Sequence, residues 1–212
     1  MTDTAKTTGW RGSESLWLEA AYNLLLEQGV EAVRVLPLAK SLNLSRTSFY
    51  SHFDSREALL DALVRRWRDK NTGNLVGQTT APAGSIAEAL LNLFDCWLST
   101  DLFDNRFDFA IRNWALGNPT LKQILEENDQ TRITAIRAMF ARFGFSPDQA
   151  QVRAFTVYYT QIGYISMMVR EEKPARIARM PFYIETFSGT RPTDAEFAAF
   201  KARHGLPRTG SQ

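Results

Sequence analysis

The sequence predicts an all-α protein with an N-terminal three-helix helix-turn-helix head and a larger C-terminal helical domain. Three observations support this prediction. Apolar residues recur at spacings of three and four along nearly every segment of the 212 residues, and no stretch alternates polar and apolar residues as a strand does. In addition, residues 35–53 have the spacing of two short helices joined by a tight turn.

Composition fits a chain with a sizeable core. The hydrophobic share of 44%, with 12% aromatic residues, is enough for one large or two modest domains. The single cysteine, Cys96, falls in a periodic apolar run, which favours a buried thiol in a reducing compartment over a redox sensor. No apolar run approaches the ~20 residues that span a bilayer, and residues 1–6 lack an apolar signal region. We therefore expect a cytoplasmic protein that does not bind a membrane.

The first helix is expected to begin after Ser13 and to end at Gly29. Ser13 is a good N-cap residue, and glycine suits the position just after a helix. One apolar face between them is made by Trp17, Ala20, Ala21 and Leu24. Residues 1–12 are expected to form a flexible arm.

The second helix carries one narrow apolar stripe, made by Val35, Leu38, Ala39 and Leu42. Pro37 suits its first turn, and Asn43 tolerates the left-handed conformation that would end it. Ser45 can then cap a third helix after only a few residues, so the two helices must cross steeply.

In the third helix, Phe49 and Phe53 share the buried face. The side chains left to point outward carry hydrogen-bonding groups of assorted reach, and they are Arg46, Thr47, Ser48, Tyr50, Ser51 and His52. A helix of this kind can lie in the major groove of DNA.

Positive charge is concentrated at this motif. The formal net charge of +2 is too small to indicate nucleic acid by itself. Residues 34–56, however, contain four basic residues and one acid. Because this excess coincides with the helix-turn-helix spacing, it favours a DNA-facing surface over an ordinary solvated one.

The stretch 44–60 resembles the signature of the tetracycline-repressor (TetR) family of bacterial regulators. The positions that match are Ala39, Tyr50, His52, Phe53, Arg56, Leu59 and Leu60. The resemblance covers about residues 13–67, and beyond it the chain is similar only as a succession of helices. The chain departs from the family's pattern at Val35 and Leu36, where a threonine cap is usual, and at Asn43, where glycine is usual.

The resemblance implies a ligand-responsive repressor that binds a palindromic double-stranded DNA operator as a homodimer. Arg46 could form a bidentate pair with guanine or contact a phosphate. Thr47 could meet a base edge or be ordinary helix surface, and the same holds for Ser48. The complete set of expected DNA-binding residues is Lys40, Ser45, Arg46, Thr47, Ser48, Tyr50, Ser51, His52 and Arg56.

Three of these have a further alternative. The resemblance places Tyr50 and His52 at phosphates, but Tyr50 could pack its ring in the head and His52 could be a satisfied surface histidine. Arg56, near a helix N-terminus, could meet a phosphate or form a salt bridge with a nearby acid.

A fourth helix leads out of the head. Asp54 and Glu57 have capping-box spacing, and apolar positions continue to Trp67. The head is expected to span 13–70. The segment 71–84, with three glycines, a proline and several threonines, indicates a boundary, after which an effector-binding and dimerisation domain spans 71–205.

Helix signals recur through this second domain. We expect helices from Ser85, around 107–114, from Asn118 to about Phe143, from Ser146, over 181–187, and a short last helix from Thr193. Residues 206–212 are expected to be disordered.

The resemblance implies an effector pocket in the second domain for an unknown small molecule. Arg112 and Asn113 are of interest because charged and amide groups beside Trp114 need a reason if buried. Aromatic residues at helical spacing more often form core. The candidate pocket residues are Phe94, Trp97, Phe109, Arg112, Asn113, Trp114, Tyr158, Tyr159 and Gln161.

The helix from Ser146 is apolar nearly all round in its second half, so it needs partners on two sides. With the helix over 181–187 it could form a four-helix bundle with a second copy, and in the TetR family the helices at this place form the dimer interface. The candidate interface residues are Phe155, Tyr159, Ile162, Gly163, Ser166, Phe182 and Phe187.

Other classes of protein fit less well. The only histidines are His52 and His204, and no glycine-rich phosphate loop or His-x-x-x-His spacing occurs, so an enzyme is not expected, nor a metal or other cofactor. A helical dimer whose head binds protein, and a transcriptional activator, are the remaining alternatives.

Overall fold

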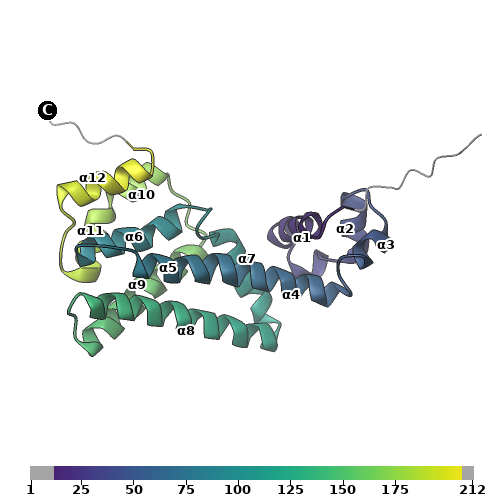
Figure 1. Ribbon diagram of the computed structural model, residues 1–212, viewed down its shortest axis with the longest axis horizontal. Coiled ribbons are helices and arrows are strands. Elements are labelled where there is room, and N and C mark those ends of the chain that lie inside the picture. Colours follow the sequence, from purple (N-terminus) through teal and green to yellow (C-terminus); the bar gives the residue numbers. More distant parts are fainter. Residues whose placement is uncertain (1–11, 207–212) are drawn as a thin grey trace, which may run out of the picture. The chain divides into compact units, whose positions relative to one another are not determined.

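The structure is a computed structural model that describes residues 12–206 (Figure 1). All regular structure in these residues is helical, which confirms the predicted fold class. None of the helices within 12–206 has the length and apolar character needed to span a membrane. Apart from Gly12 and Leu206, the expected flexible arm and disordered tail lie outside the described residues.

Contacts between residues divide the chain into two units, the first ending at Arg66 and the second beginning at Trp67. This division falls four residues before the boundary expected at Asn71. The first unit contains α1 (Glu14–Gln28), the 3₁₀ turn η1 (Val30–Ala32), α2 (Val35–Ser41), α3 (Arg46–Tyr50) and most of α4 (Arg56–Trp67).

The first unit folds around aromatic rings. Trp17 of α1 meets Phe49 of α3 edge to face, with ring centroids 5.3 Å apart, and Phe53 stacks on Phe49 at 5.6 Å. The predicted limits of α1 are confirmed, because the Ser13 hydroxyl accepts the Leu16 amide at 3.2 Å and Gly29 follows the helix with φ of 80°. Burial of this aromatic cluster holds the short α3 in place.

The predicted cap of α4 is wrong by one residue. The helix begins at Arg56, and the Ser55 hydroxyl, not the Asp54 carboxylate, accepts the Ala58 amide at 3.1 Å. Ser55 directly precedes the first helical residue, and only an oxygen at that position reaches the amide three residues on.

The segment 71–84, expected as the boundary between the two domains, is mostly helical. Residues 68–73 form a π-helical segment, η2 (Arg68–Gly73), which continues into α5 (Asn74–Thr80). Asn71 and Leu75 are completely buried, so packing outweighs the weak helix propensity of Gly73 and Gly77. Only the short stretch after Thr80 lacks helix.

The rest of the second unit is a helical bundle in which α8 packs along both α7 and α9 (Figure 1). The helix starts predicted at Ser85, Asn118, Ser146 and Thr193 are confirmed, and in each the side chain of that residue caps the helix. The short α10 had no counterpart in the sequence-based prediction. The helices are α6 (Ile86–Leu98), α7 (Asn105–Leu116), α8 (Pro119–Arg142), α9 (Pro147–Ser166), α10 (Lys173–Ala178), α11 (Met180–Ser188) and α12 (Asp194–Arg203).

Helix α6 lies at the centre of this unit and is buried on nearly all sides. Cys96 of α6 is completely buried, as predicted. Burial raises the pKa of its thiol to about 12, and the nearby Asp95 carboxylate acts in the same direction. The thiol is therefore a core side chain with little nucleophilic character.

Candidate functional site

The turn between α2 and α3 has the backbone that the sequence predicts. Asn43 adopts a left-handed conformation with φ of 53°, and the Leu44 amide donates to the Ala39 carbonyl at 2.9 Å. Two residues later the Ser45 hydroxyl accepts the Ser48 amide at 3.1 Å and caps α3. A helix-turn-helix is thus formed within 35–50.

The outer face of α3 presents polar side chains near its N-terminus. Arg46 and Thr47 are exposed in the first turn, and Tyr50 is 49% exposed in the second. Ser51 is exposed too, but its hydroxyl donates to the Ser48 carbonyl at 2.7 Å. This face combines a guanidinium, a hydroxyl with a methyl group, and a phenol, which is a set able to meet both bases and phosphates.

Two residues expected on this face are not fully presented there. Ser48 is only 6% exposed, so the expectation that it points outward is wrong. His52 is half-buried, and its Nε2 atom is buried with no hydrogen-bond partner among the described residues. Both positions lie next in sequence to the buried rings of Phe49 and Phe53, so core packing covers this edge of the helix.

Arg56 is held by the backbone of its own unit. Its Nε donates to the Val33 carbonyl at 2.6 Å and its Nη2 to the Val30 carbonyl at 2.9 Å. A third nitrogen, Nη1, is 3.9 Å from the Glu57 carboxylate. The guanidinium therefore ties the connection between α1 and α2 to the start of α4, a role that neither sequence alternative anticipated.

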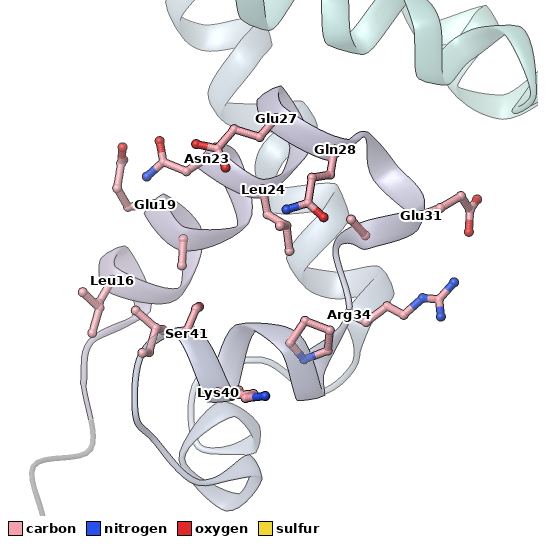
Figure 2. Close-up of a pocket in the computed structure, with 14 residues that line it drawn as sticks. Leu16, Glu19, Asn23, Leu24, Glu27, Gln28, Glu31, Arg34, Lys40 and Ser41 are labelled. Carbon is pink, nitrogen blue, oxygen red and sulfur yellow. The ribbon is translucent and has the colours of Figure 1, made fainter.

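A wide groove lies between α1 and α2, with Leu24 directed from α1 toward α2 (Figure 2). Its α1 side carries Glu19 and Glu27, and Glu31 lies beyond the end of that helix. Lys40 is exposed at the α2 side. The groove lining carries these three carboxylates and two cations, Arg34 and Lys40, so it has no excess of positive charge. The surface better suited to DNA bases is the outer face of α3.

The second unit contains a buried charge network. Arg112 of α7 forms a two-pronged pair with Asp129 of α8, with Nη1 and Nη2 at 2.9 and 2.6 Å from the two carboxylate oxygens. Its Nε also donates to Asp108 at 2.9 Å. Arg132, completely buried, donates to the same Asp108 at 3.0 Å, and the Tyr158 hydroxyl donates to Asp129 at 2.6 Å.

The network reaches the π-helical segment. Arg132 Nε donates to the Thr72 hydroxyl at 2.9 Å, Trp67 Nε1 donates to Asp108 at 2.8 Å, and Asn71 bonds the backbone of Asp104. The Arg132 guanidinium also lies 5.0 Å from the Trp67 ring centroid. These contacts join 67–72 to α7 and α8 within the second unit.

Mutual attraction outweighs burial in this network. Burial alone disfavours the Asp108 carboxylate, but the guanidinium groups of Arg132 and Arg112 overcome it and hold the Asp108 pKa below its ordinary value. Burial likewise disfavours both guanidinium groups, and their carboxylate partners raise the pKa of each. Two arginines face two aspartates, so the network has no net charge.

The nine candidate pocket residues do not enclose one cavity. Phe94 and Trp97 belong to the core, whereas Asn113 and Tyr159 are exposed. Phe109 and Trp114 are half-buried. Arg112 and Tyr158 are hydrogen-bonded within the charge network. Aromatic residues at helical spacing mostly build core here, as the alternative interpretation held.

Two of the nine, Phe94 and Gln161, do line a small pocket between α6, α9, α10 and α11. The pocket also contains residues that sequence reasoning did not select, among them Arg176, Tyr164 and Tyr183. Arg176 sits on the unpredicted α10, so no sequence signal pointed to it. For the network, a signal existed: Arg132 and Asp108 interrupt the apolar stripes of α8 and α7.

The candidate dimer residues divide by burial. Tyr159 and Phe182 are 57% and 56% exposed, and Ser166 is also exposed. Three others, Phe155, Ile162 and Gly163, are half-buried, with the Phe155 ring stacked on Tyr159 at 5.4 Å. Phe187 is 4% exposed and stacks on Phe94, so it is a core residue and its expected interface role is wrong.

Comparison with known proteins agrees with this arrangement. Residues 18–63 match the bacterial regulatory proteins of the tetR family. A 63-residue segment is 33% identical to the HTH-type transcriptional repressor KstR2 of Rhodococcus jostii, covering 30% of this chain and 31% of the relative. The chain thus matches less than a third of that relative's length.

Solved structures share the fold over most of the chain. A transcriptional regulator from Aquifex aeolicus has a TM-score of 0.63 at 18% identity, covering 84% of this chain and 96% of its own. GusR of Salmonella enterica has a TM-score of 0.62 at 20% identity, covering 87% and 96%. AmtR of Mycobacterium smegmatis has a TM-score of 0.59 at 18% identity, covering 96% and 99%.

The helix-turn-helix head therefore resembles that of bacterial regulatory proteins, and the chain as a whole shares the helical fold of solved structures of transcriptional regulators. The match to the tetR family thus lies within the first unit of the chain.

Proposed function

We propose that this chain is a repressor that binds a two-fold symmetric DNA operator as a homodimer and responds to a small molecule bound in its second unit. The observation that carries the proposal is the exposed face of α3, where Arg46, Thr47 and Tyr50 stand on a capped helix of a helix-turn-helix. Such a face fits the major groove, and its N-terminal residues reach base edges first.

We assign direct base reading to Arg46 and Thr47. Tyr50 and Lys40, both exposed, are assigned to phosphates. Ser45 contributes through its cap, and Ser51 lies on the same exposed face. Ser48 and His52 are left out because of their burial, and Arg56 acts by fixing the backbone that connects α1 to α2.

Repression is favoured over activation by the relative's name. KstR2 is named a transcriptional repressor, and a 63-residue segment of this chain is 33% identical to it. A gel-shift assay with the DNA that flanks the gene tests the proposal. A specific complex should form and weaken steeply as salt rises, because bound phosphates release counterions. A salt-insensitive complex, or none, would contradict DNA binding and favour a head that binds protein.

The homodimer is supported by apolar side chains that lie exposed on α9 and α11. Val152, Tyr159 and Phe182 are each more than half exposed, and an uncovered group of this kind marks an interaction surface. The recurrence of Val152, Phe155, Tyr159, Ile162 and Ser166 forms a stripe along α9 that a second copy could cover by two-fold symmetry.

Sedimentation analysis of Tyr159→Glu tests this interface. The substitution places a charge in the stripe and should convert the dimer to a monomer, whereas Ala199→Glu on an exposed position of α12 should remain dimeric. A wild-type monomer, or a dimer that withstands Tyr159→Glu, would rule out this surface as the interface.

A further inference from the structure

The pocket between α6, α9, α10 and α11 has mostly apolar walls with one cation. Phe94, Phe187 and Tyr183 stack in series, with ring centroids 6.1 Å and 6.0 Å apart, and Val157 and Met180 add apolar surface. Arg176 of α10 contributes the charge. Pockets of this composition bind small molecules that have a flat apolar body and one polar end.

No carboxylate of the described residues lies within hydrogen-bond distance of Arg176. Its Nη2 donates to the neutral amide oxygen of Gln161 at 2.8 Å. Its Cζ lies 4.7 Å from the centroid of the Tyr164 ring. The nearest carboxylate oxygen, on Glu171, is 3.9 Å from Nε, beyond hydrogen-bond distance. Glu171 instead bonds Arg179 and accepts the Tyr164 hydroxyl.

Two arginines of the charge network, the half-buried Arg112 and the buried Arg132, differ from Arg176 in this respect. Arg112 and Arg132 each bond a carboxylate at 3.0 Å or less, and their pKa values are raised. Burial lowers the pKa of Arg176, because no comparable anion offsets its loss of water. This partly desolvated guanidinium in an aromatic pocket thus has one carboxylate at ion-pair distance but none bonded to it, which leaves its fork open to the carboxylate of a ligand.

We infer that this pocket is the effector site and that it takes a small aromatic carboxylic acid, whose carboxylate pairs with Arg176 while its ring lies among Phe94, Tyr183 and Phe187. The inference rests on the proposed function, since it names the ligand class of the proposed regulator. A carboxylate would replace the Gln161 amide oxygen on the guanidinium fork, which binds a carboxylate in a bidentate manner.

The pocket must widen to admit such a ligand. Its cavity volume is only about 10 Å³. That is room for about one water. Arg176 occupies a helix of six residues that follows the non-helical stretch 167–172, so the anchor is on the least extensive element of the wall.

Calorimetric titration of the full chain without DNA tests the inference. The probes are benzoate, phenylacetate and 2-naphthoate, each beside its uncharged amide. At least one acid should bind saturably and about tenfold or more tightly than its amide, since one charge-assisted pair is worth that much. Equal binding of acid and amide, or no binding of any acid, would overturn the inference.

Substitutions at Arg176 test whether the acid binds in this pocket. Arg176→Gln should lose about tenfold or more in affinity for that acid, and the exposed Arg170→Gln should bind as wild type does. If Arg176→Gln does not fold, Arg176→Lys replaces it and should bind more weakly than wild type but still prefer the acid to the amide. Unchanged binding in the Arg176 variant would overturn the inference.

Because these titrations use no DNA, they are independent of the repressor proposal. Binding of an acid without binding of the operator would support the ligand site and contradict the repressor proposal. Operator binding without acid binding would do the reverse.

Discussion

Arg132 and Asp108 form an ion pair in which both side chains are completely buried, with Arg132 Nη1 3.0 Å from the Asp108 carboxylate. The same carboxylate accepts hydrogen bonds from Trp67 and Arg112, so one aspartate connects the end of α4 to α7 and α8. Stability and pH dependence of the second unit should therefore respond strongly to this residue.

Asp108→Asn should destabilise the protein by about 3 kcal/mol or more, because it leaves two buried guanidinium groups short of a negative charge. Urea unfolding measures the change. Lys122→Ala removes an exposed pair with Glu126 and should stay within about 1 kcal/mol of wild type. Equal changes in the free energy of unfolding for the two substitutions would contradict a larger stabilising contribution from the buried pair.

Acid should weaken the fold through the same carboxylate. The folded pKa of Asp108 lies below its ordinary 3.8, so its contribution to stability is full above about pH 4 and is lost as the pH falls through the folded value. The stability difference between wild type and Asp108→Asn should accordingly narrow below pH 4. A stability difference that grows in acid would show that folding does not lower the pKa of Asp108.

Cys96 should not react with a thiol reagent at pH 8 while the protein is folded. Its thiol is buried and its pKa is about 12, so almost no exposed thiolate exists. Ellman's reagent should modify it only after denaturation. Rapid modification of the folded protein would place the thiol at the surface.

Arg56→Ala should destabilise the first unit by about 1–3 kcal/mol, because it removes two hydrogen bonds to the backbone carbonyls of Val30 and Val33. Arg65→Ala, at an exposed position of the same helix, serves as the control. If Arg56→Ala leaves urea unfolding unchanged yet weakens every DNA sequence alike, the residue contacts phosphate, as the sequence first suggested.

Asn43→Ala should cost about 1 kcal/mol or more, since Asn43 has φ of 53° and alanine disfavours that region. Asn43→Gly should be close to wild type. Thermal unfolding separates the two, and an alanine variant as stable as the glycine variant would argue against a left-handed turn.

Elements governed by local chemistry could be predicted from the sequence. The Ser45 cap, the Asn43 turn and the Ser146 cap each depend on atoms a few residues apart. The helix over 68–80 could not be predicted, because Asn71 and Leu75 are buried by residues distant in sequence. Its glycines suggested a boundary that packing overrides.

The site shows the same division. Exposure of Arg46 and Thr47 follows from their place on a capped helix, whereas the role of Arg56 depends on carbonyls 23 and 26 residues earlier in the chain. The charge network unites residues from α7, α8 and α9, and the aromatic pocket needs Arg176 from a helix with no clear sequence signal. Such assemblies exist only in the folded chain.

The most direct test of the central claim is the affinity of the purified protein for a labelled operator fragment, measured by fluorescence anisotropy for wild type, Arg46→Ala and Arg65→Ala. Arg46→Ala should lose about tenfold or more in affinity and lose its preference for the operator over unrelated DNA, because a bidentate base contact is removed. Arg65→Ala should match wild type. An Arg46→Ala protein with unchanged affinity and preference would contradict DNA reading by the exposed face of α3.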